Sequence, residues 1–206
     1  LALAVYVSEY LPSDKRARVL GVLELFEGIP TVVFGYFALL FVTPLLQKVI
    51  PGLSLFNPLS AGLVMGFAIL PYVSNVAADA MQSVPRSIRE AAYALGARPY
   101  EVALKVVLPA ALSGVIAAII LAASRAIGET MIVAIAAGQR PTLTLDPRET
   151  IATMTSYIVQ AATGDQPTGS TAYYALFAVG FTLFLLTLAL NVLAQYIVER
   201  YRERYE

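Results

Sequence analysis

The stretch QPTGSTAYYALFAVGFTLFLLTLALNVLAQYIV, residues 166–198, contains no Asp, Glu, Lys or Arg. Three further windows without these residue types cover residues 28–47, 49–78 and 106–124. A helix that crosses a hydrocarbon core needs about 20 apolar residues, and each window is long enough to supply them. The pattern therefore predicts an all-α protein, a polytopic membrane helical bundle.

The composition agrees with a membrane location. Of the 206 residues 58% are hydrophobic and only 14% are charged, against about 25% charged residues in soluble domains. The chain has neither cysteine nor histidine, which excludes disulfides and thiolate ligands and removes the commonest metal ligand and acid–base catalyst. We therefore expect no metal, no bound cofactor and no catalytic residues. The net charge is zero and no basic run is interleaved with aromatics, so membrane lipid is the expected neighbour and nucleic acid is not.

The windows predict four full spans and one partial span. The full spans are expected at residues 29–47, 55–78, 106–124 and 172–198. The apolar residues 1–7 lack the charged region that opens a signal peptide, and we interpret them as the tail of a helix whose beginning is missing. Residues 1–206 are thus expected to form a single transmembrane domain.

Positive charge indicates which connections face the cytoplasm. Lys and Arg collect on the cytoplasmic side of membrane proteins, and alternation of the spans puts the first connection, the third connection and the C-terminal tail on one side. These segments hold ten of the 14 basic residues, namely Lys15, Arg16, Arg18, Arg86, Arg89, Arg98, Lys105, Arg200, Arg202 and Arg204. The three segments are therefore predicted to be cytoplasmic.

Residues 106–138 are apolar except for Arg125 and Glu129. A continuous helix of that length would reach roughly 50 Å, too long for one bilayer. Either the helix breaks near Gly128, or its end turns back as a re-entrant piece beside protein or a water-filled cavity. Residues 139–171, rich in Pro, Gly, Thr and Asp, are expected to form an outer-face connection with a short helix at residues 149–162.

The third connection, residues 79–105, and the start of the next span contain a spaced motif that consists of Glu90, Ala91, Ala92, Gly96, Leu108 and Pro109. This spacing resembles the EAA signature of type I ABC-importer permeases. The resemblance implies a short helix across the membrane surface that docks into a groove of an ATPase subunit. The alternative without a docking function is an ordinary amphipathic loop helix in which Glu-Ala-Ala occurs by chance.

The local sequence suits such a helix. Residues 87–95 are good helix formers, Pro85 precedes them, Gly96 can adopt the left-handed conformation at the C-terminus, and Pro99 prevents continuation. A second helix should run from Tyr100 toward the membrane, with a restart or kink at Pro109. No Gly-rich phosphate loop occurs in the sequence, so a partner must bind and hydrolyse any ATP.

Arg125 and Glu129 are charges at membrane depth, which usually face a bundle interior or a pathway. Four residues apart, they share one helix face if the helix is unbroken. In one interpretation they only neutralise one another, or Arg125 reaches the outer headgroups. In the other, the Arg125 guanidinium binds a passing oxyanion, and Glu129 accepts the P–OH hydrogen that a protonated phosphate offers and sulfate lacks.

The segment SRAIGETMIVAI, residues 124–135, is similar to phosphate-system permeases of the PstC type, as are residues 28–39 and 84–97. The resemblance covers nearly the whole chain, from about Glu9 to Tyr201. It implies a permease that translocates phosphate by alternating access, with Arg125, Glu129 and Thr130 in the pathway. The first span and outer segment of such permeases are absent here.

The same resemblance implies the assembly: a PstA-type sister permease, a PstB-type ATPase dimer that binds the ATP, and an extracytoplasmic phosphate-binding protein, in a bacterial or archaeal cytoplasmic membrane. Three alternatives stay open, namely a permease for sulfate or molybdate, an ATP-independent secondary transporter or channel, and a membrane enzyme. Gly35, Gly62 and Gly66 are either sites of close helix contact or ordinary membrane glycines.

Overall fold

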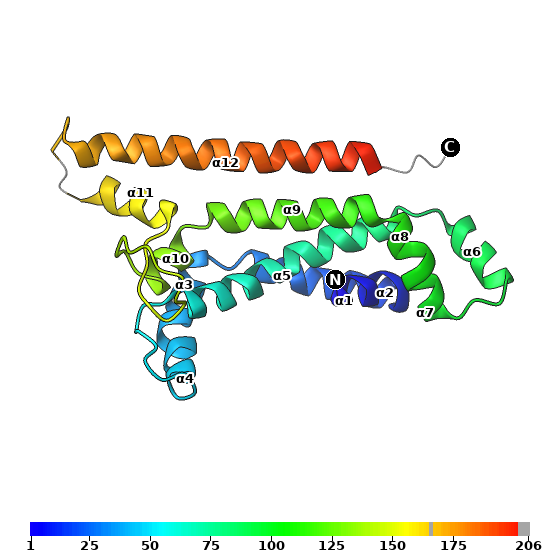
Figure 1. Ribbon diagram of the computed structural model, residues 1–206. Helices are drawn as coiled ribbons and strands as arrows, with labels where there is room; N and C mark the ends of the chain where they lie inside the picture. The colour runs from blue at the N-terminus through cyan, green and yellow to red at the C-terminus, as the bar shows by residue number, and fades with distance from the viewer. Residues whose placement is uncertain (165–166, 202–206) are drawn as a thin grey trace. The chain divides into compact units, whose positions relative to one another are not determined.

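The computed structural model describes residues 1–164 and 167–201 (Figure 1), so Arg202 and Arg204 lie outside the described residues. In the part of the chain that it describes, every regular element is helical, which confirms the all-α prediction. The elements, with η denoting a π-helical turn, are α1 (Ala2–Val5), η1 (Tyr6–Tyr10), α2 (Ser13–Glu27), α3 (Thr31–Phe37), η2 (Ala38–Val42), α4 (Thr43–Gln47), α5 (Pro58–Gln82), α6 (Arg86–Ala94), α7 (Pro99–Glu101), η3 (Val102–Val107), α8 (Leu108–Ala110), α9 (Leu112–Gly128), α10 (Met131–Ala136), α11 (Met154–Thr163) and α12 (Thr171–Tyr201).

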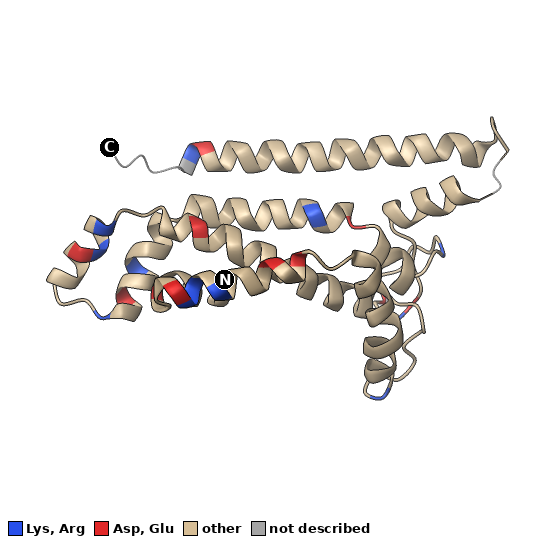
Figure 2. Cartoon of the chain, turned by 180° about the vertical axis from the view of Figure 1, so that it is seen from behind, with Lys and Arg blue, Asp and Glu red and all other residues tan. Residues whose placement is uncertain are grey.

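Two described helices are long and apolar enough to cross a membrane by themselves, Pro58–Gln82 and Thr171–Arg200. The count rises to four if each of two interrupted pairs is one span: Ser13–Glu27 with Thr31–Gln47, and Pro99–Ala110 with Leu112–Gly128. Figure 2 shows that segments coloured for charged residues are sparse along the long helices. The four predicted full spans are thus all helical, but two of them are broken or short.

The N-terminal region differs from the sequence prediction in two ways. The first helical segment continues through η1 to Tyr10, and it stops where Leu11 adopts an extended conformation before Pro12. A residue before proline is driven out of the helical region, and this boundary signal outweighed the end of the apolar run at Val7. The basic residues that were assigned to a connection belong to α2, a helix of 15 residues.

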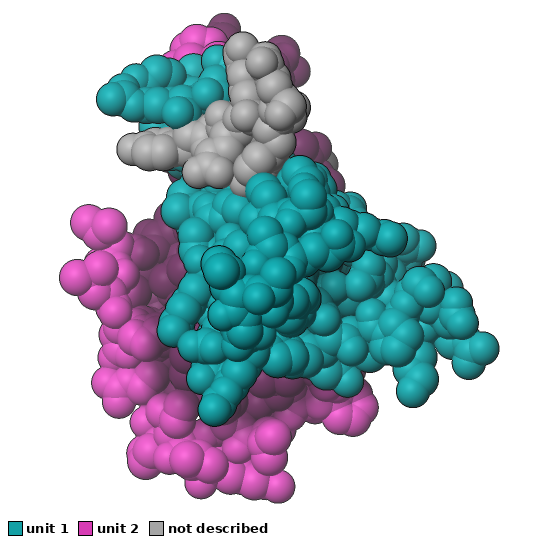
Figure 3. Space-filling view, turned by 90° about the vertical axis from the view of Figure 1, so that its right-hand side faces the viewer, with its two compact units in different colours: residues 1–28, 69–124, 190–206 teal, residues 29–68, 125–189 magenta. Residues whose placement is uncertain are grey.

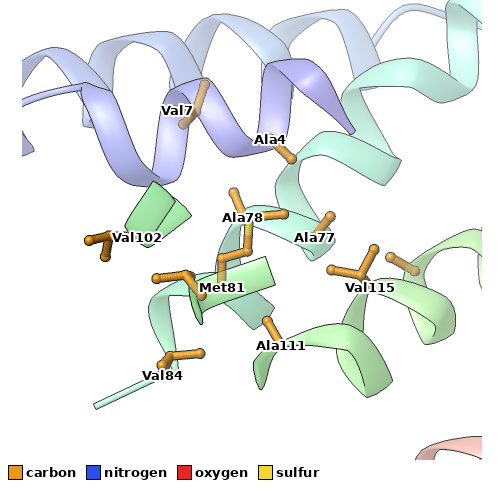
Figure 4. Packing of buried hydrophobic residues seen from close by; sticks show 11 residues of the cluster. Ala4, Val7, Ala77, Ala78, Met81, Val84, Val102, Ala111 and Val115 are labelled. Atoms are coloured by element: carbon orange, nitrogen blue, oxygen red, sulfur yellow. The ribbon is translucent and has the colours of Figure 1, made fainter. Parts of the chain in front are cut away.

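The chain divides into two compact units, coloured separately in Figure 3: residues 1–28, 69–124 and 190–206, and residues 29–68 and 125–189. The first unit packs around Met81, which is fully buried. Figure 4 shows Met81 surrounded by small and β-branched side chains from several elements. They are Ala4, Val7, Ala77, Ala78, Val84, Val102, Val107, Ala111, Val115 and Ala118.

Small residues let α5 and α9 approach closely in this unit. A Cβ atom added at Gly114 would lie 2.5 Å from the Cβ atom of Ala80, so only glycine fits. In the second unit, a Cβ atom at Gly35 would lie 3.0 Å from Cδ1 of Ile135, whereas nothing lies within 4 Å of one at Gly62 or Gly66. The close-contact interpretation is therefore confirmed for Gly35, whereas Gly62 and Gly66 make no close contact with the described residues of this chain.

The second unit has its own core. α10 and α3 make its principal contact, and its buried members are Phe34, Ala38, Ala61, Val64, Ile132, Val133, Ala136 and Ala137. A buried polar cluster lies beside them: Thr43 Oγ1 donates to Ser60 Oγ at 2.8 Å, and the backbone nitrogen of Ser60 donates to Asn57 Oδ1 at 2.8 Å. The backbone nitrogen of Asn57 donates to the carbonyl of Ala136 at 2.9 Å. Buried polar groups are tolerated when paired in this way, and the cluster fixes the end of α10 against the start of α5.

Candidate functional site: an exposed short helix and a broken span

The predicted cytoplasmic helix exists as α6, Arg86–Ala94, preceded by Pro85. Span α5 continues to Gln82, so the connection begins four residues later than the expected end at Ala78. Gly96 has a φ of 82°, and the helix ends in a Schellman motif: Ala97 N–H donates to the carbonyl of Ala92 at 3.1 Å, and Gly96 N–H to that of Tyr93 at 2.9 Å. The prediction of this helix and of its glycine stop is confirmed.

The two sides of α6 have different surroundings. Ile88 and Ala92, four residues apart, pack against the Met81 core. Glu90 and Ala91 are exposed. The motif residues are therefore divided: Ala92 anchors the helix to its own unit, whereas Glu90 and Ala91 remain accessible to another protein.

Beyond Gly96 the chain turns back as α7, which begins at Pro99. The carboxylate of Glu101 accepts the backbone N–H of Arg98 at 3.1 Å and lies 3.1 Å from Lys105 Nζ. The restart predicted at Pro109 is also present: α8 contains this proline, and the helical pair Pro99–Ala110 and Leu112–Gly128 is bent by 71°. Leu108 packs against the Met81 core while Pro109 is exposed, so Leu108 anchors the start of this bent span.

The long apolar stretch, residues 106–138, is interrupted just after Gly128, near the position predicted from sequence. α9 ends at Gly128, and α10 begins at Met131. Because Glu129 lies in the break, it does not continue the helix face of Arg125. Its Oε1 atom instead accepts the backbone N–H groups of Thr130, Met131 and Ile132 at 3.1, 3.0 and 3.3 Å. The carboxylate thus caps the first turn of α10, where unpaired N–H groups and the helix dipole favour negative charge.

Threonine side chains hold the backbone at the break. Thr130 Oγ1 donates to the carbonyl of Gly128 at 3.2 Å, and Thr155 Oγ1 on α11 donates to the carbonyl of Glu129 at 2.8 Å. Backbone groups left unpaired at membrane depth are costly, so these bonds matter. Sequence inspection identified Thr130 and missed Thr155.

α11 begins later than the predicted 149–162 helix. Thr153 is its N-cap: Thr153 Oγ1 accepts the N–H of Ser156 at 3.1 Å, and Ser156 Oγ accepts that of Thr153 at 2.8 Å. This reciprocal capping box selects the start. The preceding loop contains an exposed turn in which the Arg148 guanidinium, 2.7 Å from Asp146, lowers the pKa of that carboxyl group to about 2.

A cavity of about 710 Å³ lies in the second unit. Its polar side chains are Tyr36, Gln139, Arg140 and Thr150, and neither Arg125 nor Glu129 is among the described residues that line it. Gly138, with a φ of 95°, forms part of the wall, and a Cβ atom there would overlap the Thr150 side chain. The cavity therefore lies between residues of the predicted outer-face connection and residues of α3, η2 and α10, and not at the predicted charge pair. No group of three or more Asp or Glu residues that could hold a metal occurs within residues 1–164 and 167–201.

Long apolar helices, an exposed short helix in a connection and a broken span are features found in membrane transport permeases. The chain belongs to the family "Binding-protein-dependent transport system inner membrane component", whose pattern it matches over residues 2–203. Its fold is that of a permease chain in the inward-facing MetNI methionine ABC transporter, with a TM-score of 0.71 over 98% of this chain and 85% of that chain at 16% identity.

Curated relatives are more similar in sequence. The chain is 31% identical to the probable ABC transporter permease YqgH of Bacillus subtilis, with coverage of 97% of this chain and 64% of the relative. It is 32% identical to the phosphate transport system permease PstC of Xylella fastidiosa, with coverage of 97% and 67%. The probable PstC of Methanocaldococcus jannaschii is 28% identical, with coverage of 97% and 68%. The chain thus spans about two thirds of the length of these relatives, which are transport permeases rather than enzymes.

Proposed function

We propose that this chain is the membrane-spanning permease subunit of an ATP-driven importer of inorganic phosphate, and that it works by alternating access. The observation that carries the proposal is the similarity to PstC permeases over 97% of the chain. It includes the broken span and its Arg-Ala-Ile-Gly-Glu-Thr-Met segment. The proposed location is a bacterial or archaeal cytoplasmic membrane.

The proposed assembly contains a PstA-type sister permease, a PstB-type ATPase dimer and an extracytoplasmic phosphate-binding protein. ATP is bound and hydrolysed by the ATPase, and this chain carries no cofactor. The exposed Glu90, Ala91 and Gly96 support a docking role for α6. Tyr93 and Leu95 support it further, because their side chains are 47% and 90% exposed, and exposed apolar groups beside a polar rim are typical of protein contacts.

Arg125, Glu129 and Thr130 are the proposed pathway residues. Arg125 is exposed near the end of α9, three residues before the break, where its planar guanidinium can bind phosphate oxygens. Glu129 has a different role from the one expected from sequence. Its contacts with α10 support a function in holding the break open beside Arg125, in place of direct acceptance of a phosphate proton.

The test is uptake of radiolabelled phosphate by vesicles that contain the full-length permease, its sister subunit and the ATPase. Arg125→Ala and Glu129→Ala should each abolish uptake while the ATPase still copurifies. Glu129→Gln, which retains an acceptor oxygen for the N–H groups of α10, should retain uptake. Arg148→Gln removes an exposed cation of the outer connection and is the matched control, with uptake unchanged. Normal uptake in both alanine variants would contradict the pathway assignment.

Competition in the same vesicles separates phosphate from other oxyanions. Unlabelled phosphate should suppress labelled uptake, and equal concentrations of sulfate or molybdate should not. If sulfate or molybdate suppresses labelled uptake at least as strongly as phosphate does, that oxyanion and not phosphate is the substrate. Uptake that proceeds without the ATPase subunit would instead indicate a secondary transporter.

A further inference from the structure

Arg89 of α6 forms an ion pair across a long sequence separation. Its Nη2 atom lies 3.1 Å from Oε1 of Glu9 in η1, 80 residues earlier in the chain. The two side chains are 20% and 9% exposed. The same Nη2 atom donates to the carbonyl of Met81 at 2.7 Å. One guanidinium therefore connects the cytoplasmic helix both to the end of span α5 and to the N-terminal helical segment.

The Glu9 end of this contact is itself fixed. Ser8 Oγ donates to Glu9 Oε1 at 2.7 Å. The Arg16 guanidinium donates to the carbonyl of Val7 at 3.0 Å through Nε and to that of Leu11 at 3.3 Å through Nη2. The backbone at the end of η1 is thus held by the first turn of α2, and the Glu9 carboxylate is oriented by the Ser8 hydroxyl.

α6 has further contacts with its unit. Ile88 and Ala92 pack against the Met81 core, and the helix also contacts η3. A shielded ion pair has a defined geometry, and removal of one partner leaves the other charge uncompensated. A displacement of α6 therefore acts on Glu9 and on the end of α5 directly through Arg89.

We propose that the Glu9–Arg89 ion pair is a transmission contact, which transfers the ATPase-driven displacement of α6 to span α5 and to the N-terminal segment α1–η1. The proposal rests on the proposed importer function. Arg89 is a positioning residue in this scheme: it contacts neither phosphate nor the ATPase, and its loss uncouples ATP hydrolysis from transport rather than preventing docking.

The first experiment compares Glu9→Gln and Arg89→Gln with wild type in the reconstituted transporter. Phosphate uptake should fall by about tenfold or more because an uncompensated charge is left behind. ATP hydrolysis should continue, and the ATPase should still copurify. Lys105→Gln is the matched control: it breaks an exposed pair in the same connection, in which Lys105 is 71% exposed, and uptake should stay within about twofold of wild type.

A second experiment replaces the ion pair by a covalent link. Residues 1–206 contain no cysteine, so Glu9→Cys/Arg89→Cys introduces the only thiols of this segment, and any cysteines elsewhere in the full-length permease and in its partners are replaced. A bifunctional methanethiosulfonate that spans the former side-chain contact should restore uptake, and a reducing agent should abolish it again. The expected result follows because a transmission contact has to stay joined throughout the cycle.

Three outcomes would overturn the proposal. Uptake at the wild-type level in both Gln variants would mean that the pair transmits nothing. Loss of the ATPase from the purified complex would make the pair a contact needed for assembly. Failure of the cross-link to restore uptake would show that the two segments must separate. Failure of the proposed function is distinguishable from all three, because in that case the wild-type transporter itself takes up no phosphate.

Discussion

α6 and α10 are both short helices that begin just beyond a long one, but their ends are determined by different means. α6 lies between Pro85 and Gly96, whose backbone properties suffice to begin and end a helix. α10 begins at a carboxylate cap from Glu129, and a threonine of α11 holds the carbonyl of that residue. The first helix is determined by residue types within a local segment, and the second also by a partner 26 residues away.

This difference suggests that the two helices will respond to mutation in separate ways. A helix bounded by proline and glycine should tolerate changes to its other side chains and fail when the glycine is replaced. A helix bounded by side-chain caps should fail when the capping oxygen is lost, even where no backbone strain is introduced.

The largest expected effect concerns the cap of α10. Glu129→Ala removes the oxygen that accepts three N–H groups, so we expect both loss of phosphate uptake and a fall in stability of about 1–2 kcal/mol. Glu129→Gln retains an acceptor oxygen and should therefore keep both stability and uptake close to those of wild type. Thermal unfolding of the purified complex measures the difference. Equal melting temperatures for the two variants would contradict the capping role.

The next effect concerns the glycine stop of α6. A side chain at Gly96 must adopt a left-handed conformation, which costs roughly 1–2 kcal/mol, although nothing lies within 4 Å of an added Cβ atom. Gly96→Val should therefore weaken copurification of the ATPase by about 5- to 30-fold. Gly21→Ala in α2, where an added Cβ atom also meets nothing, is the control. Undiminished copurification of the Gly96 variant would show that the end of α6 is unimportant for docking.

A smaller effect is expected at α11. Thr155→Val removes the hydroxyl that donates to the Glu129 carbonyl at 2.8 Å, and the loss of one such hydrogen bond costs about 1 kcal/mol. The melting temperature should fall slightly. Thr182→Val removes a bond within α12, from Thr182 Oγ1 to the carbonyl of Ala178, and should have a smaller effect. If the two variants behave alike, the contact with α11 does not stabilise the break.

The smallest effect concerns pH at the outer connection. The folded pKa of Asp146, about 2, lies below its ordinary value of 3.8 because of Arg148. Its contribution to stability is therefore complete above the ordinary value and is lost as pH falls toward 2. Asp146→Asn should remove only this dependence, as measured by the melting temperature between pH 5 and about pH 2. If the melting temperatures of wild type and of Asp146→Asn are both independent of pH, the Asp146–Arg148 pair contributes nothing to stability.

Some features could be predicted from the sequence because each depends on residues that are close together in the chain. The charge-free windows located the two long apolar helices α5 and α12, and Pro85 with Gly96 located α6. The length limit of a bilayer predicted the break near Gly128, where α9 ends. The start of α11 was misplaced because Thr153 and Ser156 compete with several other polar residues in that loop, and only the folded geometry shows which pair caps the helix.

The candidate site likewise has some features that the sequence predicted and others that only the folded structure shows. The sequence by itself determined that the chain is a helical membrane protein with an EAA-type helix and an Arg-Ala-Ile-Gly-Glu-Thr-Met segment, because hydrophobic length and residue spacing are one-dimensional properties. Only the tertiary structure decided that Glu129 caps α10, that Gly35 and Gly114 lie at close approaches, and that Glu9 pairs with Arg89. These are contacts between segments far apart in sequence or between side chains and helix ends, and their partners are selected by packing in three dimensions.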